Sequence, residues 1–140
     1  MATNAQFGAQ PFIEVAQVST ANTNRDGTGT TVLLTSGPST AAADGVGKRI
    51  SRVWVARPGT STNTIVTFFY SIDGGTTKRL ISEWNIPAYT ATTTSQQAIH
   101  YCMDLTGLVL PGSTGGQAVQ LYAATTIATT LNICVESASL

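Results

Sequence analysis

His100 is the only histidine in this 140-residue chain, so it is the first residue to consider for catalysis. A general base acts beside a nucleophile and an orienting carboxylate. Asp104 shares one face of the predicted strand 98–105 with His100, but four residues of extended chain are too long for direct contact. No G-x-S-x-G nucleophile motif occurs. We therefore expect His100 to be a surface histidine and the chain not to be an enzyme.

Residues 22–27, NTNRDG, partly match a calcium-binding loop. Asn22, Asn24 and Asp26 have the ligand spacing of such a loop. However, the first ligand carries no charge, and Leu33 replaces the bidentate glutamate. The pattern predicts a plain turn.

Zinc is also not expected, because Cys102, Cys134 and His100 give three ligands where a structural zinc site takes four. We expect neither a metal nor a cofactor. The N-terminus shows no signal peptide, so we expect synthesis in the cytoplasm and reduced thiols. The cysteines are then predicted to form no disulfide and to pack on the outer, more polar faces of their strands.

The composition excludes other classes of partner. Only 10% of residues are charged, the net charge is zero, and 24 threonines are present. Nucleic-acid binders show clustered Lys and Arg instead. No apolar run approaches the roughly 18 residues that a membrane span needs. A neutral, threonine-rich surface favours contact with other protein.

Basic and aromatic residues supply the candidate contact groups. Four of the seven basic residues, Lys48, Arg49, Arg52 and Arg57, fall in segment 48–57. They indicate an edge strand that uses charge to prevent stray pairing, or alternatively a stripe that binds phosphate or glycan. Exposed aromatics would suit a carbohydrate platform, but they are equally expected in a core or a subunit interface. The predicted protein interface comprises Phe7, Phe12, Arg52, Trp54 and Tyr89.

These residues must be positioned by strands, because no window has helical periodicity and β-branched runs alternate with turn residues. The expected fold is all-β: an antiparallel β-sandwich of about eight strands, jelly-roll-like rather than immunoglobulin-like. It forms a single domain over 13–140, after an N-terminal arm over 1–12. The expected strands are 11–19, 30–36, 48–57, 64–71, 77–84, 98–105, 117–124 and 130–137.

Period-two alternation predicts which face of each strand is buried. Strand 64–71 is apolar on both faces, so it needs a second cover from a loop, an arm or a partner subunit. In strand 48–57, Ile50 and Trp54 lie opposite Val53 and Val55. The predicted core residues are Val53, Val55, Phe69, Ile99, Tyr101, Leu121, Leu131 and Ile133.

The stretch GLVLPGSTGG, residues 107–116, predicts a corner at the end of the core. Residues 108–110 close the core, and Pro111 and Gly112 stop the strand ladder. The chain then enters strand 117–124, whose expected partner is strand 130–137. In the arm, Phe7 and Phe12 are the expected docking anchors.

The sequence resembles small structural proteins of tailed bacteriophages. The likeness lies in RISRVWVARPGTSTNTIVTFFYSIDGG (49–75), LISEWNIPA (80–88), LTGLVLPGSTGGQAVQLYAATT (105–126) and LNICVES (131–137). It implies a virion component, and most of all a capsid decoration (cement) protein. Such a protein is a jelly roll that binds the major capsid protein on the outer surface of a head shell, often as a homotrimer. It would be made in the host cytoplasm.

The contact residues of that family are not carried over, because Ser113, Thr114, Gly115 and Gly116 replace the aromatic or basic residue expected after the corner. A receptor- or glycan-binding module of a phage tail remains the alternative. The two differ in where the protein lies in a purified particle.

Overall fold

The computed structural model describes residues 11–37, 47–97, 99–112 and 116–140. Strands dominate this part of the chain, and none of its helices is long and apolar enough to cross a membrane. The elements are β1 (Pro11–Val18), β2 (Val32–Ser36), β3 (Lys48–Ala56), β4 (Thr64–Ser71), β5 (Arg79–Ile86), β6 (His100–Tyr101), the 3₁₀ helix η1 (Met103–Leu105), β7 (Val109–Leu110), β8 (Gln120–Thr125) and β9 (Leu131–Ser139).

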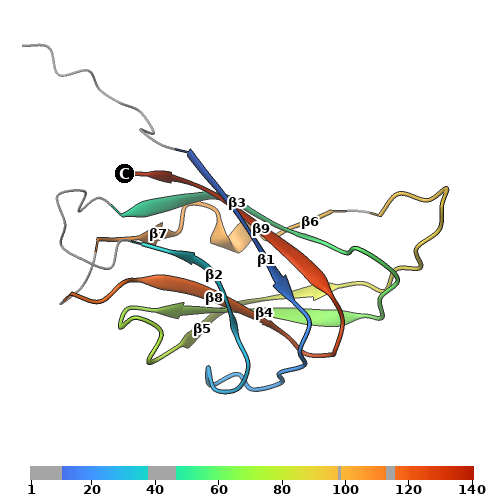
Figure 1. Cartoon of the computed structure of the whole chain (residues 1–140), viewed down its shortest axis with the longest axis horizontal. Helices are drawn as coiled ribbons and strands as arrows, with labels where there is room; N and C mark the ends of the chain where they lie inside the picture. Colours follow the sequence, from blue (N-terminus) through green and yellow to red (C-terminus); the bar gives the residue numbers. More distant parts are fainter. Residues whose placement is uncertain (1–10, 38–46, 98, 113–115) are drawn as a thin grey trace, which may run out of the picture.

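Two antiparallel sheets face each other as layers (Figure 1). The first sheet has the order β1-β9-β3-β6, with β7 also paired to β3, and the second has the order β2-β8-β4-β5. Pairing is nested: β1 with β9, β2 with β8, β3 with β6 and β7, and β4 with β5. A ribbon folded at the β4–β5 hairpin and then rolled up gives this pattern. The fold is therefore the predicted jelly-roll sandwich.

The β4–β5 hairpin at the fold of this ribbon follows from its turn residues. Gly74 and Gly75 have φ of 68° and 89°, a region that side chains disfavour. The Asp73 carboxylate accepts hydrogen bonds from the Thr77 backbone N–H (2.8 Å) and the Ser71 hydroxyl (2.7 Å). These bonds stabilise the charged form and lower the pKa of Asp73 to about 2. The acid thus has a structural role in the turn.

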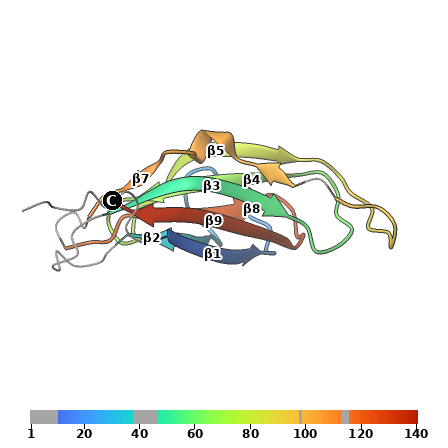
Figure 2. The same cartoon turned by 90° about the horizontal axis from the view of Figure 1, so that it is seen from above.

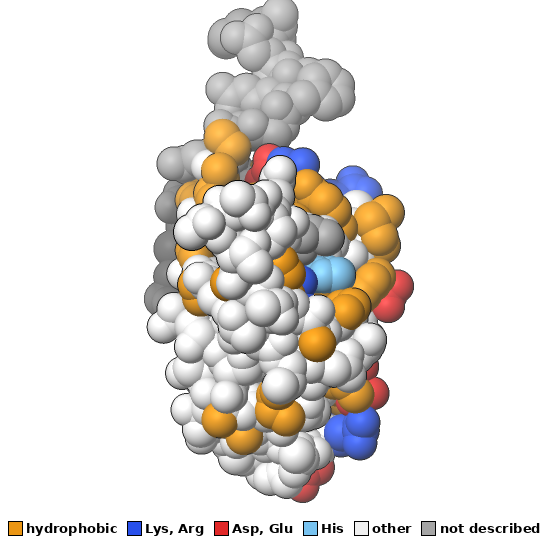
Figure 3. Space-filling model, turned by 90° about the vertical axis from the view of Figure 1, so that its right-hand side faces the viewer, with side chains coloured by type: hydrophobic (Ala, Val, Ile, Leu, Met, Phe, Trp, Pro, Cys, Tyr) orange, Lys and Arg blue, Asp and Glu red, His pale blue; other side chains and the backbone are white. Residues whose placement is uncertain are grey.

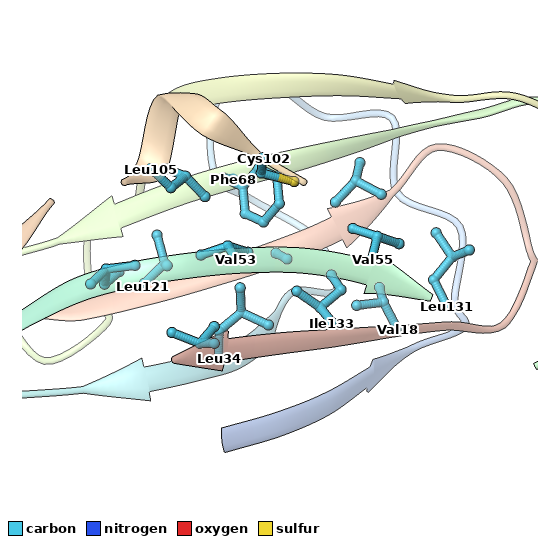
Figure 4. Packing of buried hydrophobic residues seen from close by; sticks show 14 of the residues in the cluster. Val18, Leu34, Val53, Val55, Phe68, Cys102, Leu105, Leu121, Leu131 and Ile133 are labelled. Carbon is cyan, nitrogen blue, oxygen red and sulfur yellow. The ribbon is translucent and has the colours of Figure 1, made fainter. Parts of the chain in front are cut away.

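The core lies between the two sheets (Figure 4). Five of the predicted core residues belong to it, namely Val53, Val55, Leu121, Leu131 and Ile133. Ile50 is also buried, although strict alternation placed it opposite Val53. The β3–β9 register shifts between Ile50 and Arg52. Such a bulge allows Ile50 and Val53 to face the core together.

The prediction that Ile99 and Tyr101 lie in the core is wrong. Ile99 and Tyr101 are each 46% exposed, whereas Cys102, predicted to lie on the outer face, is only 1% exposed. The expected strand 98–105 is only two residues long here, and η1 follows it, so the period of two fails. Cys102 and Leu105 point into the core instead. Cysteine is among the residue types most often buried.

The corner after η1 closes the core largely as expected. Leu110 is fully buried and Leu108 packs against the core, whereas Val109 is 38% exposed. The expected pairing of the last two strands is wrong, because β8 pairs with β2 and β4 while β9 pairs with β1 and β3. Consecutive strands often form hairpins, but in this rolled ribbon the connection after β8 crosses to the other sheet.

The second cover that β4 requires comes from the chain itself. Phe69 is fully buried, although it lies on the opposite face of β4 from Phe68, which is in the core. The segment between β1 and β2 passes beneath the second sheet in Figure 1. There Arg25 Nε lies 2.6 Å from Glu83 Oε1, and Gly27 lies against the backbone of Lys78.

Residues 22–27 form a turn held by their own side chains. The Asn22 amide donates to the carbonyl oxygens of Thr28 and Thr30, at 2.9 Å each. Asp26 Oδ1 accepts from the Thr28 hydroxyl and backbone N–H, which lowers the pKa of Asp26. Asn22 and Asp26 therefore act as turn-forming groups.

Candidate protein-interaction site

The outward-facing side of the first sheet carries a continuous row of apolar and aromatic residues. Val15 is the Cα partner of Cys134, Cys134 of Trp54, and Trp54 of Tyr101, so the row crosses β1, β9, β3 and β6. Directly opposed residues of antiparallel strands lie on the same face. We call this surface the outer row, made of Val15, Cys134, Trp54 and Tyr101.

A charged row runs alongside the outer row. Ile13, Glu136 and Arg52 are aligned in the same way on β1, β9 and β3. Arg52 donates from Nε (2.9 Å) and Nη2 (2.6 Å) to one oxygen of Glu136. This pairing raises the pKa of Arg52 and leaves the pair neutral.

Arg52 also holds the aromatic residues in place. Its guanidinium carbon lies 5.1 Å from the Trp54 ring centroid and 5.9 Å from that of Tyr101. The two rings are 6.4 Å apart and tilted by 49°. Contacts of this geometry are favourable both between a cation and a ring and between two rings. Trp54 and Tyr101 of the outer row thus contact each other and Arg52.

Large apolar side chains are more exposed on the outward side of the first sheet than on the second sheet. Ile13 and Val15 are 69% and 64% exposed, and Met103, next to the row on η1, is 66% exposed. On the second sheet the β1–β2 segment covers part of the surface, and Leu33 and Ile81 are 43% and 41% exposed. Within the described residues, no segment covers the first sheet in this way. Contiguous exposed apolar surface is typical of interaction sites.

The predicted interface residues do not form one cluster. Arg52 and Trp54 lie together beside the outer row. Phe12 belongs to β1, is half-buried, and has Lys48 Nζ 4.5 Å from its ring centroid. Tyr89 lies in the connection after β5, where its hydroxyl donates to the Ser95 carbonyl. Phe7 is outside the described residues, as is most of the predicted arm 1–12, although β1 already begins at Pro11.

Tyr89 contributes to a structural clamp around Arg57. Arg57 is 4% exposed and donates to the Pro87 carbonyl, while its own backbone groups bond to the Gln97 side chain. The guanidinium carbon lies 4.9 Å from the Tyr89 ring centroid. Burial lowers the pKa of Arg57. The clamp ties the long connection between β5 and β6 to the end of β3.

Three of the four basic residues of 48–57 thus have individual local partners. Lys48 Nζ lies 3.3 Å from Glu14, Arg52 pairs with Glu136, and Arg57 forms the clamp. The expected edge strand is wrong, because β3 lies between β9 and the β6 and β7 pieces.

His100 is half-buried at the same end of the molecule as Arg57. Burial and the positive charge of Arg57 lower its pKa, so the imidazole is neutral near pH 7. Among the described residues, no three His, Cys, Asp or Glu side chains gather in a way that could hold a metal ion. Figure 3 shows few charged side chains at this end, and hydrophobic side chains beside the histidine.

Sequence reasoning missed Val15, Tyr101 and Met103 as surface residues. An apolar residue in a strand is normally assigned to the core, but that rule works in one direction only. Residues 98–105 gave no local signal of this, because Asp104 falls on the same predicted face as His100 and the alternation stays regular up to Leu105, although η1 replaces the strand there.

No protein-family model matches the sequence, and no curated protein matches it. Among solved structures, the chain is similar to one from the T13 particle of infectious bursal disease virus, at 11% identity and a TM-score of 0.42, over 93% of this chain and 31% of that one. A chain from the Gx strain of this virus gives 11% identity and a TM-score of 0.40, over 93% and 32%. Our chain spans about a third of the length of these viral chains. The resemblance to tailed-phage proteins therefore remains a prediction.

Proposed function

We propose that this chain is a virion structural protein, and more specifically a capsid decoration (cement) protein. It would bind the major capsid protein on the outside of a bacteriophage head shell and stabilise the shell. The observation that carries the proposal is the uncovered outer row on the first sheet, whereas the β1–β2 segment covers part of the second sheet. The proposal includes no catalysis, metal or cofactor.

The chemistry of this face suits a protein partner. Tyrosine, tryptophan and arginine are enriched at the centres of protein interfaces, where they contribute most of the binding energy. Trp54 and Tyr101 are aromatic, and the charge of Arg52 is already matched by Glu136. Docking this face therefore leaves no charge of the Arg52–Glu136 pair uncompensated.

The test is attachment to purified head shells that lack this protein. Trp54→Ala and Tyr101→Lys alter the outer row, and Leu33→Lys is the matched control because Leu33 is 43% exposed on β2 of the other sheet. We expect both outer-row variants to bind at least about tenfold more weakly, as truncation of an interface anchor does. The control should bind normally. Co-sedimentation measures binding, and circular dichroism confirms that each variant is folded.

Normal binding by both outer-row variants would contradict the proposed face. Absence of the protein from purified heads would contradict the decoration role itself.

The alternative is a tail-associated module that binds a receptor or glycan. The tilted rings of Trp54 and Tyr101 beside Arg52 favour it, because sugars stack on exposed aromatic rings. This alternative predicts binding to isolated bacterial envelope, with the same loss in Trp54→Ala. Locating the protein on the head or on the tail of purified particles separates the two functions.

A further inference from the structure

The free edge of β1 differs from the other sheet edges of this fold. All eight residues of β1 pair with β9 without a register shift. On its other side, no described strand pairs with it, and Figure 2 shows β1 at the margin of the first sheet. An edge strand presents a row of free N–H and C=O groups, which is a template for pairing with another strand.

The other edges carry features that hinder such pairing. β2 is only five residues long and has a register shift between Leu33 and Thr35. β5 has Arg79 and Glu83 exposed, and its register shifts opposite Phe68 and Phe69. On the far side of the first sheet, β6 and β7 have two residues each and are separated by η1. Charges, bulges and short strands are the usual protections of an edge.

β1 has neither outward charge nor bulge. Its outward side chains are the uncharged Pro11, Ile13, Val15 and Gln17, all exposed. Its one acid, Glu14, is on the opposite face, where Lys48 Nζ lies 3.3 Å away. β1 thus carries no charge on its outer face, and the charge of Glu14 on its inner face is paired with that of Lys48.

We propose that β1 pairs antiparallel with β1 of a second copy of this chain, so that two first sheets join into one continuous sheet. The second copy fits because antiparallel pairing of a strand with itself brings equivalent faces together. A register centred on Val15 sets Ile13 opposite Gln17 and Glu14 opposite Ala16, so no acid faces an acid. Apolar Val15 side chains then meet across the twofold axis.

This contact closes at two copies, because the same edge serves both partners. A homotrimer, which the phage resemblance implies, would need two different edges joined head to tail if it formed by strand pairing. The edges of β2, β5 and the β6–β7 pieces are poorly suited to that role. The dimer also places two outer rows on one continuous face.

The test is the mass of the full chain in solution, measured by sedimentation equilibrium over a wide range of concentrations. We expect twice the 14.6 kDa of one chain. Val15→Lys brings two ammonium groups together at the twofold axis and should weaken self-association by about tenfold or more. Ile13→Lys is a second variant at the same edge. Met103→Lys is the matched control, because Met103 is 66% exposed at the opposite edge of the same sheet.

Amide hydrogen exchange adds a readout specific to strand pairing. Only every second amide of β1 points away from β9, so alternate amides of β1 should become protected as concentration rises. The same amides should stay unprotected in Val15→Lys. A monomer or a trimer, an unchanged dimer in both edge variants, or equal dissociation by Met103→Lys would overturn the proposal. None of these measurements involves a head shell, so the dimer and the decoration role fail or succeed separately.

Discussion

Cys102 and Cys134 lie on opposite sides of the first sheet. Cys102 is in the core, whereas Cys134 lies half-buried in the outer row beside Trp54. Both thiols are free in the structure. Burial raises the pKa of Cys102 to about 12 and also raises that of Cys134. Two side chains that point to opposite faces of one sheet are badly placed for a disulfide.

The two thiols should therefore react at different rates with a thiol reagent at about pH 8. Cys134 should react in a fast phase in the native protein, and Cys102 only as the protein opens. Cys134→Ser should remove the fast phase alone. Mass spectrometry of unreduced protein, alkylated after denaturation, should show two modified thiols. If neither cysteine were alkylated in that experiment, the two cysteines would be joined in a disulfide.

At the scale of residues, the sequence predicted Arg52 and Trp54 as contact groups, which the structure places on the outward side of the first sheet, but it placed Tyr101 in the core. Alternation reports which residues are apolar, and an apolar residue facing a partner resembles one facing the core. Arg57 was recognised as basic, but its burial depends on Pro87 and Gln97, which are about 30 and 40 residues further along the chain. Such long-range contacts have no local signal in the sequence.

Strand elements were predictable mainly from runs of β-branched and aromatic residues bounded by turn residues, whereas regular alternation alone was not sufficient, as 98–105 shows. β4, β8 and β9 lie close to their expected ranges, and the strands expected at 64–71 and 77–84 pair as a hairpin across the Asp73-Gly74 turn. The failures have physical causes: a bulge after Ile50 changed which side chains face inward, and η1 interrupted the strand expected at 98–105. Which strands pair depends on the global roll of the ribbon, so the partner of β8 could not be read from its own residues.

The corrected core makes a stability prediction at the scale of elements. Ile133→Ala in β9 removes methyl groups from a fully buried site and should lower the free energy of unfolding by about 2–5 kcal/mol. Ile99→Ala, next to β6, removes the same atoms from a side chain that is 46% exposed and should change it by about 0.5 kcal/mol or less. Urea denaturation compares the two. Equal losses would show that residue 99 is part of the core after all.

Across the whole molecule, neutrality is maintained locally as well as in total. The chain has seven basic and seven acidic residues. Arg25, Lys48 and Arg52 each form an ion pair with a glutamate. A molecule of this kind has little long-range field with which to attract a partner. The docking proposed above must therefore depend on apolar contact and on short-range hydrogen bonds.

Attachment to a head shell should consequently depend little on salt. We expect the dissociation constant to change by less than about threefold between low and high salt, whereas binding through several phosphate contacts weakens by about a thousandfold or more. Burial of the outer row should also give a negative heat-capacity change on binding. Isothermal titration calorimetry at several temperatures and two salt concentrations measures both quantities. The double variant Arg52→Met/Glu136→Met should leave the salt dependence unchanged, because it removes both members of a pair whose charges cancel. A steep loss of affinity with salt would mean that charged groups outside the outer row make the contact.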